Sequence, residues 1–234
     1  MTPGPEPLKG QQSLPLEQSR APARSNFIVS ASNASALAAL DAWRDWPGGK
    51  LALVGPKASG KSHLASAWAA QVGARQVRGD ALASLGVMSP GPLVIEDVDR
   101  AVGETSLLAL IDAADQGSPL LMTGRQPPRS WPTELPDLTS RLAALMVAEL
   151  QTPDDVVLGG LMRQFFRERN IVPRKGVIEF LLRRIERSAP AARAVVERMD
   201  EAAAAENRSV TRDLAREILG DEPPNHDLFD ETSD

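Results

Sequence analysis

The sequence predicts an α/β fold in which a five-stranded parallel sheet forms a base and a small helical lid domain follows it. Short apolar runs alternate with helical patterns up to residue 150, and this alternation is typical of parallel sheets whose strands are joined by helices. From residue 151 onwards only helical patterns remain. A glycine-containing segment separates the first apolar run from the first long helix, which indicates a sharp turn at the end of a strand.

The expected elements follow one another along the chain. A helical pattern over 36–43 is broken by the Pro-Gly-Gly sequence at 47–49. The five apolar runs expected as strands are 51–54, 74–78, 92–97, 119–124 and 145–150. Helices are expected at 61–72 and 104–115 in the base, and at 154–169, 174–187, 190–206 and 211–219 in the lid. The Thr-Pro-Asp-Asp sequence at 152–155 is a typical helix start, with proline and acidic residues in the first turn.

The chain is expected to have four parts. Residues 1–25 are polar and rich in proline, and such a segment buries too little apolar surface to offset the entropy of ordering it, so we expect a disordered tail. Residues 26–150 form the expected base and residues 151–220 the expected lid. The last part, 221–234, is an acidic tail.

Composition excludes several classes of function. The acidic tail holds six acidic and no basic residues, so the rest of the chain is close to neutral although the net charge is −5. A neutral body lacks the basic surface of most nucleic-acid-binding proteins, and no sequence-specific DNA binding is expected. The chain has no cysteine, which excludes disulfides and thiolate metal sites, and its two histidines are too few for a metal site built from histidine. No apolar run reaches the length of a membrane span and no signal pattern is present, so we expect a cytoplasmic protein.

One motif carries specific chemistry. The sequence matches the pattern G-x-x-x-x-G-K-[ST] in full over Gly55, Pro56, Lys57, Ala58, Ser59, Gly60, Lys61 and Ser62. It follows an expected strand and opens an expected helix, which is the context that a phosphate-binding loop needs. The two glycines permit a tight loop whose backbone N–H groups surround phosphate oxygens, and the helix N-terminus adds partial positive charge. Lys61 is expected to reach the β- and γ-phosphates of a nucleotide, and Ser62 to bind Mg²⁺.

A pair of acidic residues complements the phosphate-binding loop. Glu96 and Asp97 end the apolar run Leu-Val-Ile, and a carboxylate at the end of a neighbouring strand is what a P-loop site needs to hold its metal. In most such ATPases the aspartate comes first and the longer glutamate second, so the order here places the shorter side chain at the position that activates water. Thr123, at the end of the next strand, could contact the γ-phosphate or water.

Six stretches share the pattern of one known family. They are FIVSASNASALAAL (27–40), GPKASGKSHLASA (55–67), LVIEDVD (93–99), LLMTGRQPP (120–128), LPDLTSRL (135–142) and ARAVVERMD (192–200). Together they resemble the nucleotide-binding domain of the bacterial replication initiator DnaA. The resemblance is strongest to the shorter DnaA-related AAA+ ATPases of the Hda type, the regulatory inactivators of DnaA. It covers roughly residues 11–220, and it implies an AAA+ P-loop ATPase that binds ADP or ATP with Mg²⁺.

The resemblance implies roles for residues around the nucleotide. Phe27, Ile28 and Asn33 match the segment that runs beside the adenine. A histidine directly after the P-loop, here His63, is typical of the DnaA-related group.

It also implies the catalytic and sensing residues. Glu96 matches the metal-binding acid and Asp97 the acid that activates water. Thr123 matches the first sensor position, and Arg193 matches the second sensor, which reaches the phosphates of its own nucleotide. Arg141 matches the arginine finger, which projects towards the nucleotide of a neighbouring subunit. Without the resemblance, the two arginines would be interpreted as ordinary surface residues.

The N-terminal tail carries a second resemblance. Gln11, Ser13, Leu14, Pro15 and Leu16 fit the hexapeptide Q-x-[S/D]-L-P-L by which Hda-type proteins dock on the sliding clamp (β subunit) of DNA polymerase. The expected partners are therefore the clamp and DnaA, with a homodimer also possible. The protein is expected to stop initiation by stimulating hydrolysis of DnaA-bound ATP, while its own hydrolysis is weak, and to associate with the bacterial nucleoid or replisome through the clamp.

Two alternatives remain open. One is a self-sufficient AAA+ ATPase, such as a helicase loader of the DnaC type, which would need a helicase-binding domain that 25 tail residues do not provide. The other is a DnaA-like initiator paralogue. The 14 acidic-rich residues after position 220 are too few, and wrongly charged, for the DNA-reading domain of DnaA.

Overall fold

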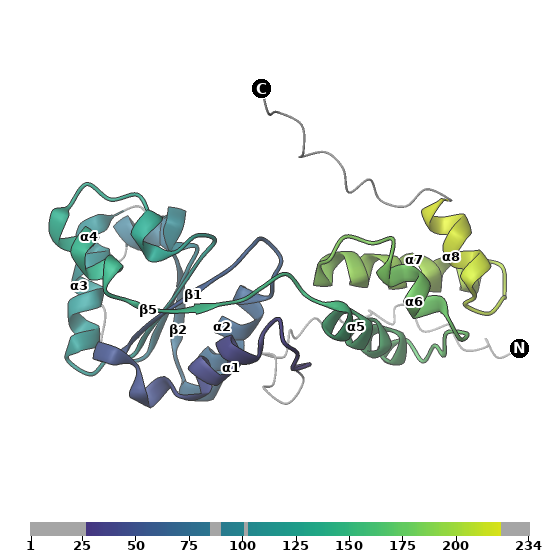
Figure 1. Ribbon diagram of the computed structural model, residues 1–234, viewed down its shortest axis with the longest axis horizontal. Coiled ribbons are helices and arrows are strands. Elements are labelled where there is room, and N and C mark those ends of the chain that lie inside the picture. Colours follow the sequence, from purple (N-terminus) through teal and green to yellow (C-terminus); the bar gives the residue numbers. More distant parts are fainter. Residues whose placement is uncertain (1–26, 85–89, 101–102, 221–234) are drawn as a thin grey trace, which may run out of the picture.

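The computed structural model describes residues 27–84, 90–100 and 103–220. The base is a five-stranded parallel sheet in the order β2-β3-β4-β1-β5, which confirms the predicted α/β fold class (Figure 1). The strands are β1 (Lys50–Val54), β2 (Arg75–Arg78), β3 (Leu93–Glu96), β4 (Leu120–Gly124) and β5 (Met146–Glu149). All five lie within one or two residues of the apolar runs that predict them.

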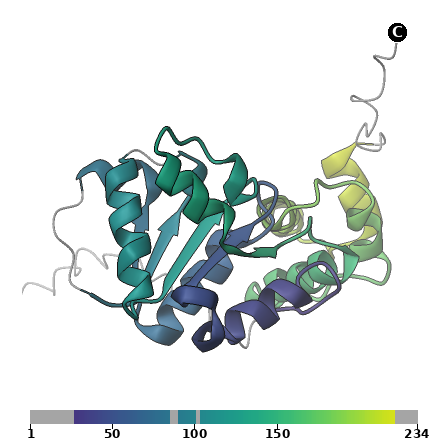
Figure 2. The ribbon, with the colours of Figure 1, turned by 60° about the vertical axis from the view of Figure 1, so that its left-hand side comes forward.

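Helices cover both faces of this sheet (Figure 2). The base helices are α1 (Ala34–Asp41), α2 (Lys61–Val72), α3 (Glu104–Asp115) and α4 (Pro136–Ala143). Short 3-10 turns lie at Trp43–Asp45, Pro47–Gly49, Gly79–Ser84, Val98–Arg100 and Pro128–Ser130.

Alternate side chains of the interior strand β1 enter two different cores. Leu51 and Leu53 pack with residues of α1 and α2 on one face. Ala52 and Val54 pack with residues of α3 and α4 on the other. Because successive strand side chains point to opposite faces, a strand covered on both sides must be apolar at every position. Polar groups are therefore confined to the strand ends, where several of the predicted site residues lie.

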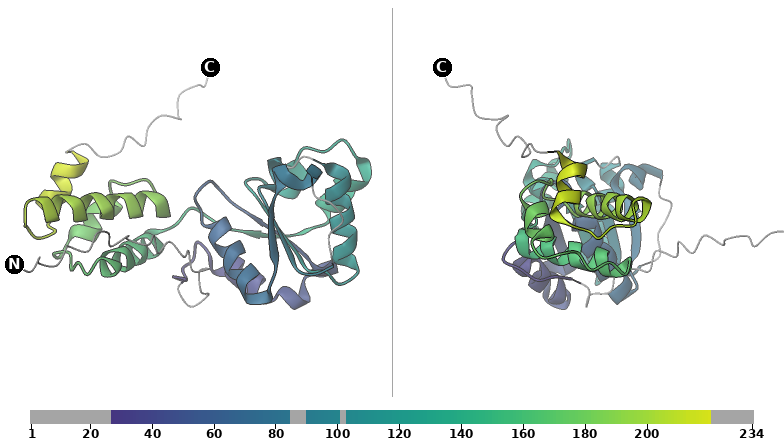
Figure 3. Two further views of the ribbon diagram at one scale, coloured as in Figure 1. Left: turned by 180° about the vertical axis from the view of Figure 1, so that it is seen from behind. Right: turned by 90° about the vertical axis from the view of Figure 1, so that its right-hand side faces the viewer.

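Four helices form the second part, on the side of the base where the phosphate-binding loop leaves β1 (Figures 1 and 3). They are α5 (Asp155–Glu168), α6 (Val177–Leu182), α7 (Ala189–Ala205) and α8 (Arg212–Leu219). The four share one apolar core that includes Met162, Phe166, Val196 and Leu214. Within the described residues, none of the helices combines the length and the apolarity needed to cross a bilayer.

The helix expected over 174–187 is shorter in the structure, where α6 spans Val177–Leu182. Gly176 precedes it with φ 84°, a left-handed conformation that glycine adopts without strain, so the helix begins only after this residue. Side-chain caps then start the neighbouring helices: Asp154 accepts a hydrogen bond from the N–H of Val157, and Ser188 accepts one from Ala191.

The interior strand β1 supplies a test of this architecture. Leu53→Ala should lower the free energy of unfolding by about 2–5 kcal/mol, because Leu53 is fully buried and its truncation leaves a cavity. Val172→Ala is the matched control, since Val172 is 90% exposed, and should change stability by less than about 0.5 kcal/mol. Urea denaturation measures both, and equal losses for the two variants would contradict the burial of β1 in the interior of the sheet.

Candidate functional site

The P-loop lies between β1 and α2 and has the backbone that its glycines permit. Gly55 has φ 154°, and a Cβ there would lie 2.2 Å from the carbonyl oxygen of Leu150. Gly60 has φ 102° and directly precedes α2. Ala58 is also left-handed, with φ 61°, so the loop contains one strained non-glycine residue. A side chain at Gly55 would therefore displace either the loop or the strand end that lies against it.

Lys61 is held inside this loop. Its ammonium group donates hydrogen bonds to the carbonyl oxygens of Gly55 at 2.7 Å and Pro56 at 2.8 Å. Burial lowers the pKa of Lys61, while Asp97 and Asp99 act in the opposite direction. A phosphate group would offer the same ammonium charged acceptors, which make stronger hydrogen bonds than neutral carbonyls.

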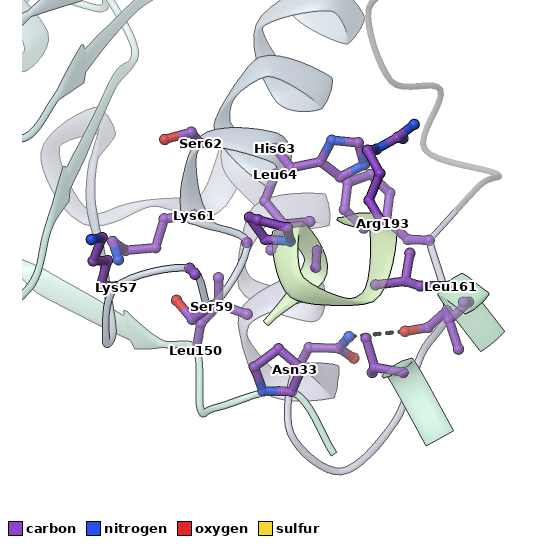
Figure 4. Close-up of a pocket in the computed structure, with 18 of the residues that line it drawn as sticks. Asn33, Lys57, Ser59, Lys61, Ser62, His63, Leu64, Leu150, Leu161 and Arg193 are labelled. Atoms are coloured by element: carbon purple, nitrogen blue, oxygen red, sulfur yellow. Dashed lines mark hydrogen bonds between the residues drawn. The ribbon is translucent and has the colours of Figure 1, made fainter. Parts of the chain in front are cut away.

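The N-terminus of α2 adds donors at the same place. The first turn of α2 contains no acidic residue, so nothing on the helix itself offsets its partial positive charge. Ser59 lines the cavity described below, and its Oγ atom is buried without a hydrogen-bond partner among the described residues. Ser62 is exposed in the first turn (Figure 4). Backbone N–H groups, a buried hydroxyl and an ammonium group therefore converge on one anion-binding position.

The predicted acidic pair lies at the end of β3, which β4 separates from β1. Asp97 has φ 54°, and its N–H donates to Thr123 Oγ1 at 3.1 Å. Thr123 is 1% exposed and does not line the cavity, so its observed contact is support for the backbone of Asp97. Glu96 ends the strand half-buried and also lies outside the cavity lining, whereas Asp97 is part of it.

A cavity of about 850 Å³ joins the P-loop to the helical part. Most of the residues predicted for the nucleotide line it: Phe27, Ile28, Asn33, Lys57, Ala58, Ser59, Gly60, Lys61, Ser62, His63, Asp97 and Arg193 (Figure 4). The predicted residues outside the lining are Gly55, Pro56, Glu96, Thr123 and Arg141. The volume falls within the range of ordinary ligand pockets, and the walls combine apolar side chains with a few charged groups.

The segment before α1 forms one wall of the cavity. The ring of Phe27 lies 4.6 Å from that of His63, centre to centre. Ile28 packs on Gly160 of α5 so closely that a Cβ on Gly160 would lie 2.4 Å from Ile28 Cδ1. The Asn33 side chain donates to the carbonyl oxygen of Ile28 at 2.9 Å, the bond drawn in Figure 4. These contacts fix the segment between the P-loop helix and the lid.

The lid contributes residues that sequence patterns did not single out. Val157, Leu161, Gln164 and Phe165 of α5 line the cavity, and Arg193 of α7 lies with its guanidinium carbon 4.2 Å from the centre of the Phe165 ring. The other lining residues missed by sequence reasoning are Leu64, Arg125, Leu150, Pro153, Ala189 and Pro190. The approach of the lid residues depends on how the lid meets the base, which no local pattern reports. The base residues carried a signal, because Leu64 directly follows the predicted His63 and because Arg125 and Leu150 lie at predicted strand ends.

Arg141 lies away from the cavity and is surrounded by carboxylates. Its guanidinium pairs with Asp112 at 2.6 Å, with Asp137 at 3.1 Å and with Asp115 at 3.8 Å. Asp115 also pairs with Lys50 at the start of β1, so this cluster is at the edge of the sheet opposite the P-loop. These bonds raise the pKa of Arg141, chiefly through the one to Asp137. The side chain cannot contact a phosphate bound to its own P-loop from this position.

The described residues contain no group of three or more histidine or acidic side chains able to enclose a metal by themselves. Mg²⁺ does not require one, because it commonly takes one or two protein ligands and completes its shell with water and substrate phosphates. The exposed hydroxyl of Ser62 and the carboxylate of Asp97, both in the cavity lining, fit that requirement. The predicted ligand Glu96 precedes Asp97 but lies outside the lining.

Comparison with solved structures identifies the architecture. Domain III of the replication initiation protein DnaA from Thermotoga maritima superposes with a TM-score of 0.69 at 19% identity, covering 83% of this chain and 94% of that one. AMPPCP-bound DnaA from Aquifex aeolicus gives 0.65 at 16% identity, over 75% of this chain and 64% of that one. A variant of RuvB from Thermotoga maritima gives 0.65 at 17% identity, with coverages of 86% and 72%. No family model matches the sequence. The chain therefore has the fold of the AAA+ P-loop ATPases.

The contact between Phe27 and His63 gives a prediction on pH. Desolvation lowers the pKa of His63 in the folded protein, so the unfolded chain binds a proton at this residue more readily. The free energy of unfolding therefore decreases as the pH falls below the ordinary pKa of about 6.5. An NMR titration of the His226→Gln variant, which leaves one histidine, should show a midpoint below that value. A His63→Gln substitution should make stability less sensitive to acid, and a midpoint at or above 6.5 would contradict the prediction.

Proposed function

We propose that this protein is an AAA+ ATPase that binds an adenine nucleotide, ADP or ATP, together with Mg²⁺ in the cavity between the base and the lid. The observation that carries the proposal is the complete P-loop, with Lys61 buried in it, opening onto a cavity of about 850 Å³. Strand, loop and helix follow in the order that this chemistry needs. The fold shared with nucleotide-bound DnaA supports it.

The lining of the cavity suits both parts of a nucleotide. Phe27, Ile28, Leu161 and Phe165 supply apolar surface for a planar base. The P-loop also lines the cavity, together with several basic side chains and a single acidic one. The charged lining residues are Lys57, Lys61, Arg125, Arg193 and Asp97. This excess of positive charge favours a polyphosphate.

Removing the buried ammonium group should test nucleotide binding. Lys61→Ala should weaken ADP and ATP binding by about tenfold to a hundredfold, the range expected when a charged hydrogen bond is lost. Lys175→Ala is the control, because Lys175 is exposed in the lid and outside the cavity lining. Isothermal titration calorimetry measures both, and equal affinities of wild type and Lys61→Ala would refute the site.

We further propose a regulatory role of the Hda type. In this role the tail peptide 11–16 docks on the sliding clamp, and Arg141 acts on ATP bound to DnaA. The peptide lies outside the described residues, so its support is the sequence resemblance. The position of Arg141 is a second support, because a group that completes a neighbour's site has to face away from its own cavity.

This arrangement leads us to expect weak intrinsic hydrolysis. Arginine fingers contribute about 10³–10⁵ in rate where they have been measured, and a single subunit whose Arg141 faces elsewhere lacks that contribution. Asp97, one methylene shorter than glutamate, is also a poorer match for the residue that activates water. A self-sufficient ATPase such as a helicase loader predicts fast turnover instead.

Two variants should separate clamp docking from activation. With DNA-loaded clamp present, wild type should stimulate hydrolysis of DnaA-bound ATP. Arg141→Ala should abolish the stimulation while clamp binding and nucleotide affinity stay unchanged. The double variant Leu14→Ala and Leu16→Ala should lose clamp binding, because each leucine buries apolar surface worth about 1.5–3 kcal/mol before ordering costs, and should lose only the clamp-dependent part of the stimulation.

Single-turnover hydrolysis of labelled ATP on DnaA, with clamp binding measured in parallel, gives both readouts. Asp137→Ala is the matched control for Arg141→Ala, since it alters the same surface but keeps the guanidinium. Stimulation by Arg141→Ala at the wild-type rate would exclude Arg141 as an arginine finger. Fast turnover of ATP by the protein alone would favour the self-sufficient ATPase.

A further inference from the structure

Arg125 occupies a central position at the edge of the sheet where the nucleotide is proposed to bind. It directly follows β4, the strand between β3 and β1. Gly124 pairs in register with Val54, the last residue before the P-loop. On the other side, Thr123 accepts a hydrogen bond from the N–H of Asp97. The main chain therefore leaves the sheet at Arg125 between the P-loop and the acidic strand end.

Asp99 holds the backbone of Arg125 in place. The N–H of Arg125 donates to Asp99 Oδ2 at 3.1 Å, and Asp99 belongs to the 3-10 turn that follows the acidic pair. That turn is itself closed by a hydrogen bond from the N–H of Arg100 to the carbonyl oxygen of Asp97. The Asp99 carboxylate thus engages the main chain of Arg125, and it makes no ion pair with the guanidinium.

The side chain of Arg125 is exposed and lines the cavity. Among residues 27–84, 90–100 and 103–220, its guanidinium has no hydrogen-bond or ion-pair partner. Its charge nevertheless reaches the P-loop: burial is the main cause of the lowered pKa of Lys61, and the proximity of Arg125 contributes in the same direction. Lys61 and Arg125 are therefore two cations that line one cavity close enough to interact, while Asp97 and Asp99 act on the pKa of Lys61 in the opposite direction.

Such a pair of like charges is unfavourable in the protein alone and becomes favourable when an anion lies between them. The P-loop N–H groups, the N-terminus of α2 and Lys61 all approach that anion from the side of β1. Arg125 approaches from β4, next to Asp97. A guanidinium presents a planar set of donors that can bind two phosphate oxygens at once.

We propose that Arg125 binds the terminal phosphate of a nucleoside triphosphate held in its own subunit, and that it makes this site favour a triphosphate over a diphosphate. The inference rests on the proposed nucleotide site and assigns a specificity-determining residue within it. It concerns a group on the base, whereas Arg193 approaches the cavity from the lid and Arg141 faces the opposite edge of the sheet.

The test compares two nucleotides on the full-length protein. Calorimetric titration with the non-hydrolysable triphosphate AMPPCP and with ADP, both with Mg²⁺, gives the ratio of the two affinities. Arg125→Gln should lower the affinity for AMPPCP by about tenfold or more and change that for ADP by less than about twofold. Arg125→Lys, which keeps the charge but not the planar fork, should recover part of the loss.

Arg129→Gln is the matched control, since Arg129 is an exposed arginine on the next 3-10 turn and lies outside the cavity lining. It should leave both affinities unchanged, and thermal unfolding confirms that each variant is folded. An unchanged AMPPCP affinity in Arg125→Gln, or an equal loss for both nucleotides, overturns the inference. Failure of the nucleotide site itself would look different, because wild type would then bind neither nucleotide or bind them as Lys61→Ala does.

Discussion

The contact on which the site depends is the close approach of the P-loop to the end of the edge strand. The N–H of Leu150 donates to the carbonyl oxygen of Val54 at 2.8 Å, which extends the pairing of β5 with β1 by one residue. The Leu150 carbonyl oxygen then lies against Gly55, where no Cβ would fit. The same short segment, after β5, is the linker to the lid. The loop that would surround phosphates and this linker therefore share one backbone contact.

Burial on both faces of the sheet decides where chemistry can be placed. The interior strands β1, β3 and β4 are apolar almost throughout, and a charge inside them would lack any partner. Polar groups gather instead where these strands end, at Lys61, Asp97 and Arg125. The parallel arrangement brings these ends to one edge, so three segments far apart in sequence supply a single site.

Much of this architecture could be predicted because it follows from local patterns. Buried strands appear as apolar runs, and the P-loop carries its own spacing. The contribution of α5 could not be predicted, because Phe165 and Leu161 reach the cavity only after the lid has packed on its own core. Thr123 shows a second limit: its position at a strand end was predicted, but its contact with the backbone of Asp97 depends on the register between two strands. The extent of α6 was overestimated because the apolar pattern continues past the residues that form the helix.

The segment that precedes α1 contacts both the base and the lid. Phe27 lies against His63 at the start of α2, and Ile28 lies against Gly160 in the lid. A ligand that brings the lid closer to the base would therefore also strengthen the contacts of this segment with both. By thermodynamic reciprocity, an interaction that holds Phe27 and Ile28 in this position would strengthen ligand binding by the same factor. An interaction at the point where the chain enters the base and the binding of a ligand in the cavity are thus energetically coupled.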